Sequence, residues 1–296
     1  MPSAKAKGVA CMVASAFGFA LMAFFVRLCD DYGGGVSCFQ KSFFRNVVAF
    51  AVALPVFLRS RRGGRAPAWP GLRASGLLLL RSALGTAGLF ANFYALGLIP
   101  IAESQALNKT APFFTLLFAW AFLREKATLR QVGTLAIAFA GVVLVAKPGF
   151  AGEAAVPLAL GLLGGVCAGA AYTCVRSLRK QGVDPALIVL VFSVFSCLAS
   201  LPFAVLSFDP MTPAQVLILV GAGCGAALGQ FGITLAYGYA PPGEIAVYDY
   251  SNILFTAVFG YAFFSQMPDA LSLAGFAAIL AAAVRLHASP RRAAGR

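Results

Sequence analysis

Several cationic side chains interrupt long apolar runs of this sequence, and these are the residues able to hold a counter-charge. Lys109, preceded by Asn108, stands in the middle of the apolar run 101–123. Arg45 lies in "KSFFRNVV" and Arg81 in "LLLLRSALG", where most neighbours are also apolar. A buried cation is costly unless a partner or a polar cavity compensates it. The three cations therefore indicate either internal ion pairs or a site that binds an anion.

Carboxylates that could pair with these cations are few. Asp249 lies inside the apolar run 243–265, whereas Glu103 and Glu244 stand near the starts of two such runs. If Asp249 pairs with one cation, two deep cations remain without a counter-charge. The same three carboxylates are candidates for carrying a coupling proton, because burial favours their protonated form. In an alternative interpretation they bind a cationic substrate.

Enzymatic chemistry has little support in the sequence. The chain holds one histidine, His287, and no CxxC, HExxH, Walker A or GxSxG motif. An intramembrane acyltransferase, the enzyme alternative, would need a nucleophile or a His–carboxylate pair near the lipid headgroups. We expect no catalytic residue, no cofactor and no metal site.

The composition places the elements that carry these residues in a membrane. Of the 296 residues 60% are hydrophobic and 11% are charged, and the mean hydropathy is +0.85. Soluble domains are nearer half apolar and a quarter charged, and water would leave the excess apolar surface uncovered. Most of the seven cysteines fall inside apolar runs. Cys29 and Cys38 flank one gap, and whether they pair is left open.

Ten apolar runs are long enough to cross a bilayer as helices, and short clusters of Gly, Pro, Lys and Arg separate them. Runs so long and so uniformly apolar exclude lipid-facing strands, so we predict an all-α integral membrane protein. The predicted transmembrane helices are 8–28, 37–58, 74–98, 101–123, 129–146, 157–177, 185–207, 214–238, 243–265 and 270–287.

The distribution of Lys and Arg predicts the orientation of these helices. With a cytoplasmic N-terminus, ten helices place both termini and every even-numbered gap on the cytoplasmic side, and the opposite gaps hold only Arg27 and Lys147. We therefore predict a multi-pass protein of the cell membrane, the bacterial inner membrane, with both termini cytoplasmic. The net charge of +13 then faces anionic lipid, and no nucleic-acid partner is expected. The cytoplasmic cations are Lys5, Lys7, Arg59, Arg61, Arg62, Arg65, Arg73, Arg124, Lys126, Arg130, Arg176, Arg179, Lys180, Arg285, Arg291, Arg292 and Arg296.

The chain repeats itself at a constant spacing. Gly88 in "GLFANFYALGLIPIAE" (88–103) aligns with Gly229 in "GQFGITLAYGYAPPGE" (229–244), and this repeat offset holds without a gap through a PxxE in both. Each half holds five helices, so the second half enters the membrane from the opposite side. Such inverted-topology repeats are common in secondary transporters, whose substrate site lies near the midplane. The predicted organisation is a first five-helix repeat in 1–147, a linker in 148–156, a second repeat in 157–287 and a basic tail in 288–296.

Ten helices in two repeats with this PxxE joint resemble the drug/metabolite transporter superfamily, specifically its EamA-type members. The most specific stretch is "APFFTLLFAWAFLREKATLRQVGTLAIAFAGVVLV" (111–145), and the resemblance covers essentially the whole chain. It implies ten helices with both ends cytoplasmic, no ATPase, and export or uptake of small organic solutes. The second half departs from the pattern, since "SQMPDAL" (265–271) replaces "REKATLR" (124–130).

Depth in the membrane brings the three cations to one level. At 1.5 Å per residue, Lys109 sits roughly 12 Å into its helix, near the midplane, and Arg45 is about as deep. The third helix begins at the cytoplasmic side, and Arg81 lies about ten residues into it, at a similar level. We predict that Lys109 and Arg45 form an anion site beside Asn108. Arg81 is a weaker third member, because a lower tilt would let it reach the inner surface.

Aromatic residues accompany the charges. Under the repeat offset Asn108, in "NKTAP" (108–112), aligns with Asp249, in "YDYSN" (248–252), so the two positions are pseudo-equivalent. Asp249 stands between Tyr248 and Tyr250. We predict that these two tyrosines wall the cavity and hydrogen-bond a polar solute, with Tyr94 and Tyr172 as further candidates. Packing between helices is the alternative role for all four.

The function that these features predict is secondary transport of a small metabolite by alternating access. The solute is expected to be anionic or zwitterionic, such as a carboxylate or an amino-acid derivative. The alternative is a cation or drug exporter that uses Asp249, Glu103 and Glu244 as binding carboxylates. The partners are the solute and the lipid bilayer, and a monomer suffices for the mechanism. The identity of the solute, the direction of transport and its coupling are left open.

Overall fold

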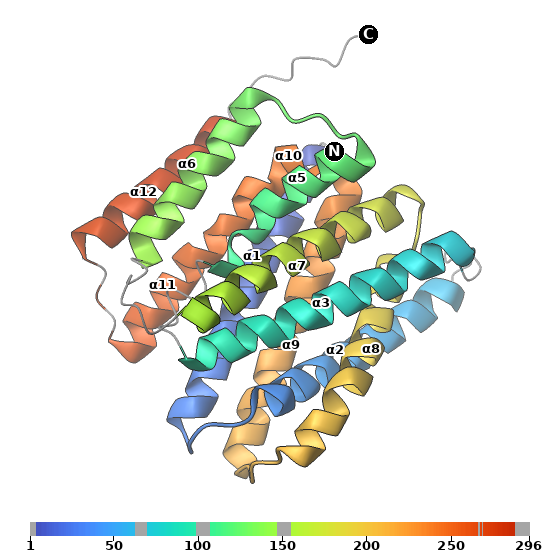
Figure 1. Ribbon diagram of the computed structural model, residues 1–296, viewed down its shortest axis with the longest axis vertical. Coiled ribbons are helices and arrows are strands. Elements are labelled where there is room, and N and C mark those ends of the chain that lie inside the picture. Colours follow the sequence, from blue (N-terminus) through green and yellow to red (C-terminus); the bar gives the residue numbers. More distant parts are fainter. Residues whose placement is uncertain are drawn as a thin grey trace.

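The structure is a computed structural model, and it describes residues 4–62, 70–98, 107–146, 155–265, 267 and 269–287. All regular secondary structure among these residues is helical, as predicted, and the helices pack side by side (Figure 1). The elements are α1 (Ala4–Asp31), α2 (Cys38–Arg62), α3 (Leu72–Leu98), α5 (Ala111–Leu123), α6 (Leu129–Ala146), α7 (Ala155–Lys180), α8 (Pro185–Leu206), α9 (Pro213–Tyr239), α10 (Pro242–Ile245), η1 (Ala246–Tyr250), α11 (Ser251–Phe264) and α12 (Ala270–His287).

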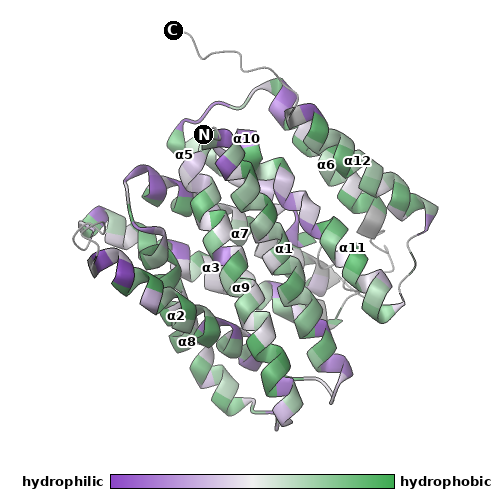
Figure 2. Cartoon of the chain, turned by 180° about the vertical axis from the view of Figure 1, so that it is seen from behind, coloured by the Kyte–Doolittle hydropathy of each residue, from purple (hydrophilic) through white to green (hydrophobic). Residues whose placement is uncertain are grey.

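The helices have the length and hydropathy of membrane-spanning helices, which confirms the predicted fold class. Within the described part of the chain, α1, α2, α3, α7, α8 and α9 are each long and apolar enough to span a bilayer, and α5, α6 and α12 are shorter apolar helices. Figure 2 shows apolar residues along most of the helices and hydrophilic residues gathered at several of their ends. Many large apolar side chains are exposed, among them Trp120 and Leu198, as lipid-facing residues are.

The predicted helices 101–123 and 243–265 are not continuous, which corrects the sequence-based expectation. In the first, α5 begins only at Ala111, after a turn at residues 109–110. Pro112 lies in its first turn and lacks the amide hydrogen that would continue a helix back towards Asn108. The second is divided into α10, the 3-10 segment η1 and α11. Non-α backbone at membrane depth is tolerated where protein buries it, and every residue of η1 is buried.

The second half of the fold repeats the first with inverted topology. Helices α6 and α12 begin and end at positions related by the repeat offset already visible in the sequence. Helices α5 and α11 end alike, because Arg124 and Ser265, which the same offset relates, both adopt a left-handed conformation with φ of 54°. Residues other than glycine rarely adopt that conformation. Its occurrence at both equivalent positions is therefore a specific mark of the repeat.

Helices of the first half pack against helices of the second half, and the pairs follow the repeat. Helix α1 packs on α9 as α7 packs on α3, while α6 packs on α12 and α2 on α8. Glycines permit close crossings: a Cβ added to Gly18 of α1 would lie 2.6 Å from the backbone nitrogen of Gly229 on α9. A Cβ added to Gly88 of α3, the equivalent of Gly229, would lie 3.1 Å from the carbonyl oxygen of Gly164 on α7. Small residues at such crossings let membrane helices approach closely.

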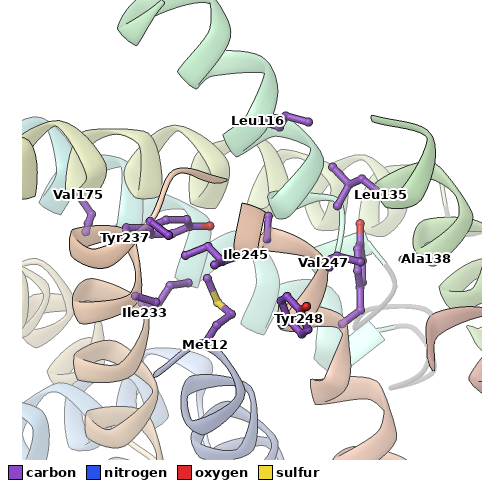
Figure 3. Packing of buried hydrophobic residues seen from close by; sticks show 14 of the residues in the cluster. Met12, Leu116, Leu135, Ala138, Val175, Ile233, Tyr237, Ile245, Val247 and Tyr248 are labelled. Carbon is purple, nitrogen blue, oxygen red and sulfur yellow. The ribbon is translucent and has the colours of Figure 1, made fainter. Parts of the chain in front are cut away.

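A buried apolar cluster holds the broken helix of the second half in place. Met12 of α1, Ile233 and Tyr237 of α9, and Ile245 and Val247 beside the break belong to this cluster (Figure 3). The residues of η1 make a single short turn, so packing rather than helix length fixes their position. This packing positions Asp249, which lies within η1.

Candidate substrate site

A cavity of about 100 Å³ lies between the two halves of the fold. Helices α1, α2 and α3 and the turn before α5 line it from the first half, and α7, α8, α9, η1 and the start of α11 line it from the second. Its polar lining includes Arg45, Arg81, Lys109, Gln230 and Asp249. The structure thus brings the three cations and the deep carboxylate singled out in the sequence to one cavity.

Lys109 and Asp249 form a buried ion pair. Lys109 donates a hydrogen bond from Nζ to Oδ2 of Asp249 at 3.0 Å, and the two side chains are only 6% and 8% exposed. Each residue stands in the interruption of its own half, Lys109 in the turn before α5 and Asp249 in η1. The pair therefore connects the two broken helices. Because the carboxylate neutralises the lysine, Lys109 is not left with a free charge for a solute.

Arg81 has the lowest exposed fraction of the three cations, at 2%, although the sequence suggested that it could reach the inner surface. One terminal nitrogen donates to Oε1 of Gln230 at 2.6 Å, and Cζ lies 3.7 Å from the ring centroid of Phe192. Its Nε and its other terminal nitrogen have no hydrogen-bond partner, and no carboxylate in the described part of the chain pairs with it. A cation over an aromatic face gains partial compensation, which leaves the guanidinium able to bind an anion.

Arg45 approaches the same aromatic ring from α2. It is 4% exposed, and its Cζ lies 5.9 Å from the ring centroid of Phe192. Its Nε donates to the thioether sulfur of Met22 at 3.0 Å, which is a weak acceptor, and a terminal nitrogen has no partner. Arg45 and Arg81 thus carry two positive charges and three nitrogens that have no hydrogen-bond partner among the described residues. Two guanidinium forks so placed can bind a carboxylate or a similar anion.

The remaining predicted binding residues divide into two groups. Asn108 and Tyr172 line the cavity. Tyr94 does not, because it is 49% exposed on α3. Tyr248 and Tyr250 are buried in the apolar cluster, outside the cavity lining, and Tyr248 donates to a backbone carbonyl of α12 at 3.4 Å. The arrangement of these two tyrosines is that of packing residues.

The other predicted carboxylates lie elsewhere. Glu244 stands in the first turn of α10, and it is not among the residues that line the cavity. Glu103 falls outside the residues that the structure describes. Of the three proton-coupling candidates, the structure therefore brings Asp249 to the cavity.

Three amides in the cavity lining were not singled out from the sequence: Asn92, Gln230 and Asn252. Asn252 donates to the carbonyl of Ala16 at 2.9 Å, whereas Oδ1 of Asn92 has no partner. Their signal was available, since an amide inside an apolar run raises the same question as a charge does. Phe192 carried no such signal, because it is one of 27 phenylalanines in a chain of apolar helices.

Comparison with known proteins adds independent findings. The sequence model of the EamA-like transporter family matches residues 6–147 and 156–286. The chain is 29% identical to the pseudopaline exporter CntI of Pseudomonas aeruginosa, an alignment that covers 94% of this chain and 95% of that protein. It is 28% identical to the riboflavin transporter of Brucella anthropi, over 85% of this chain and 88% of that one. The identity to solute carrier family 35 member G1 of Mus musculus is 29%, over 93% and 78%.

A solved crystal structure superposes on this chain with a TM-score of 0.77 and covers 94% of it and 98% of the other protein. At 18% sequence identity that likeness shows the fold alone. The names of the relatives above are those of small-molecule transporters rather than enzymes.

Proposed function

Since the chain belongs to the EamA-like transporter family, we propose that it carries a small organic solute with an anionic group by alternating access. The observation behind this proposal is the pair Arg45 and Arg81, which is buried without a carboxylate partner in the described part of the chain. Uncompensated buried charge is costly. An anion bound between the two guanidinium groups would neutralise them. It would also accept hydrogen bonds from the nitrogens that have no partner in the protein.

The rest of the cavity suits a solute that also has hydrogen-bond donors. Oδ1 of Asn92 is buried without a partner, so it can accept from an ammonium or amide group. Asn108 and Tyr172 add an amide and a hydroxyl to the lining. This combination favours a zwitterionic solute or an anionic one with polar substituents over a purely apolar acid.

The transport step requires the two halves to move relative to each other. The cavity of about 100 Å³ is smaller than the several hundred cubic ångströms typical of ligand pockets, so a metabolite fits only when the halves separate. Binding of the anion lowers the repulsion between Arg45 and Arg81, which favours closure around the solute. The glycine crossings of α1 on α9 and of α3 on α7 keep the sliding surfaces free of large side chains.

The cation-exporter alternative is less well supported by the described residues. It needs free carboxylates at the binding site, yet Asp249 already accepts a hydrogen bond from Lys109. Glu244 lies outside the cavity lining. A cationic solute would also approach Arg45 and Arg81, which repel it.

Ligand-dependent stabilisation tests the proposed site. The purified protein is heated with organic acids, amino-acid derivatives and organic cations, and the unfolding temperature is measured against solute concentration. We expect acids or amino-acid derivatives to raise it. Arg81→Gln and Arg45→Gln should each weaken the apparent affinity at least tenfold, because truncating one partner of a buried charge pair costs about 2–5 kcal/mol.

Arg130→Gln is the matched control, because it removes an arginine that is exposed on α6 and leaves the cavity lining unchanged. Its affinity should equal that of the unmodified protein. Stabilisation by cations alone, or anion affinity that is unchanged in both cavity variants, would exclude the proposal.

A further inference from the structure

A larger hollow of about 670 Å³ lies on the flank of the bundle, between α3, α5 and α7. Leu77, Leu80 and Leu84 line it along α3, and Phe118 and Phe122 line it along α5. Leu80 and Phe122 are exposed, so the hollow opens to the outer surface of the helices. We call these residues, with those named below at its polar end, the flank groove.

The flank groove is most polar at one end. Arg73, Ser177 and Gln181 stand there, at the beginning of α3 and the end of α7. Between Arg73 and Leu84 the axis of α3 rises about 16 Å, close to half of the roughly 30 Å hydrocarbon core of a bilayer. The groove therefore runs from the headgroup level to the bilayer centre, along one leaflet.

The corresponding seam in the other half of the fold is closed by aromatic packing. It lies between α9, α11 and α1, where Phe24 has its ring centroid 5.3 Å from that of Phe259 and 4.8 Å from that of Phe263. Under the repeat offset, Phe259 and Phe263 are the equivalents of Phe118 and Phe122 in the flank groove. The same two aromatic positions thus line a filled seam in one half and an open one in the other.

One difference between the corresponding helices α1 and α7 accounts for the opening. "FFVRL" (24–28) of α1 aligns with "TCVRS" (173–177) of α7 through a shared Val-Arg. Phe24 therefore corresponds to Thr173, which lines the flank groove. A threonine does not reach the facing aromatic rings as a phenylalanine does, so the space stays empty of protein.

We propose that the flank groove binds an anionic phospholipid, with one acyl chain along Leu77, Leu80 and Leu84 and the phosphate at Arg73. An apolar hollow at membrane depth that opens laterally meets hydrocarbon rather than water. Arg73 is exposed and makes no ion pair with the described residues, while the nearby Arg176 and Lys180 are held by Glu125. A basic side chain at that level attracts an anionic headgroup. The inference depends on the membrane fold and not on which solute the central cavity takes.

A glycine in the groove offers a clean way to fill it. Gly76 lines the groove on α3, and a Cβ added there would meet nothing within 4 Å. Gly76→Phe should occupy the space of the acyl chain without displacing protein atoms. Gly133 on α6 is likewise exposed with no atom near an added Cβ, and it lies outside the groove. Gly133→Phe is therefore the matched control.

Native mass spectrometry of the detergent-purified protein, titrated with phosphatidylglycerol or phosphatidylcholine, provides the test. The unmodified protein and Gly133→Phe should bind one phosphatidylglycerol in preference to phosphatidylcholine, and Gly76→Phe should bind it at least tenfold more weakly. Arg73→Gln should lose about fivefold in phosphatidylglycerol affinity and with it the headgroup preference. Because Arg73 is exposed, Arg73→Gln should fold, and it tests the proposed phosphate contact even if Gly76→Phe fails to fold. Equal binding by Gly76→Phe and Gly133→Phe, or a headgroup preference that survives in Arg73→Gln, would overturn the proposal.

Discussion

The 3.0 Å contact between Lys109 Nζ and Asp249 Oδ2 separates two roles among the cations of the cavity. Lys109 is compensated within the protein and joins the two interrupted helices. Arg45 and Arg81 keep nitrogens without partners and remain available to a solute. Of the three cations at this depth, Lys109 makes a structural contact, whereas Arg45 and Arg81 form the proposed binding site.

Substitution of the ion pair tests the structural role. Lys109→Met leaves Asp249 as an uncompensated buried charge, which should destabilise the protein by about 3–5 kcal/mol. Lys109→Met/Asp249→Asn removes both charges and should recover most of the loss. Unfolding temperatures in detergent, measured without any solute, report both effects. A single variant as stable as the unmodified protein, or a double variant no better than the single one, would argue against the ion pair.

Depth counting along the sequence was enough to group Lys109, Arg45, Arg81 and Asp249, because apolar runs of bilayer length fix the level of each residue. It could not choose their partners. The counting assumed continuous helices, whereas Lys109 lies in a turn and Asp249 in a 3-10 segment. Tyr248 and Tyr250 flank Asp249 in that segment, and both belong to the apolar cluster rather than to the cavity lining.

Helix crossings decide how closely the two halves can approach. At Gly18 an added Cβ would lie 2.6 Å from the nitrogen of Gly229 and 2.7 Å from the carbonyl oxygen of Gly225. Both are backbone atoms, which cannot rotate away as a side chain can. The α1–α9 crossing therefore depends on the absence of a side chain at this position.

Gly18→Ala should destabilise the protein by about 1–3 kcal/mol, because overpacking forces the two backbones apart. Gly133→Ala, where an added Cβ meets nothing, should instead be neutral or stabilising by up to about 1 kcal/mol, since alanine favours helix more than glycine does. The unfolding temperatures of both variants, measured in the same detergent, show whether each substitution stabilises or destabilises the protein. Equal shifts in the same direction would show that helix propensity, and not the crossing, governs position 18.

The positions of most helices could be predicted because length and hydropathy are sufficient for a membrane span. The interruptions could not, since the residues around Lys109 and Asp249 stay largely apolar through each break. Pro112 was a local signal for the first break, because proline begins a helix more readily than it continues one. Pro241 and Pro242 mark the beginning of α10 and gave no signal for the break at η1. The glycine contacts and the Phe24 cluster depend on helix pairing across the halves, which the sequence of one helix does not contain.

For the whole molecule, the inverted repeat links internal symmetry to orientation. Helices of the two halves enter the membrane from opposite sides, so one experimentally placed loop fixes all the others. The excess of Lys and Arg on one side predicts that side to be cytoplasmic. The repeat was predictable from the constant offset between the two halves, and it reappears in the matching ends of α6 and α12.

Cysteine accessibility tests this orientation. Gly35, in the exposed loop between α1 and α2, should lie outside, and Gln181, in the exposed turn after α7, should lie in the cytoplasm. In a cysteine-free background, a membrane-impermeant maleimide added to intact cells should label Gly35→Cys and spare Gln181→Cys until the cells are permeabilised. The reverse pattern would invert the whole topology.

Uptake by proteoliposomes tests most directly whether the arginine pair serves an anionic solute. Radiolabelled organic acids, amino-acid derivatives and organic cations are offered to vesicles that contain the unmodified protein, Arg81→Gln or Arg130→Gln. We predict saturable uptake of at least one acid or amino-acid derivative, an at least tenfold lower rate at low solute concentration in Arg81→Gln, and an unchanged rate in Arg130→Gln. Uptake restricted to cations, or an Arg81→Gln protein that transports the anionic solute as fast as the unmodified protein does, would contradict it.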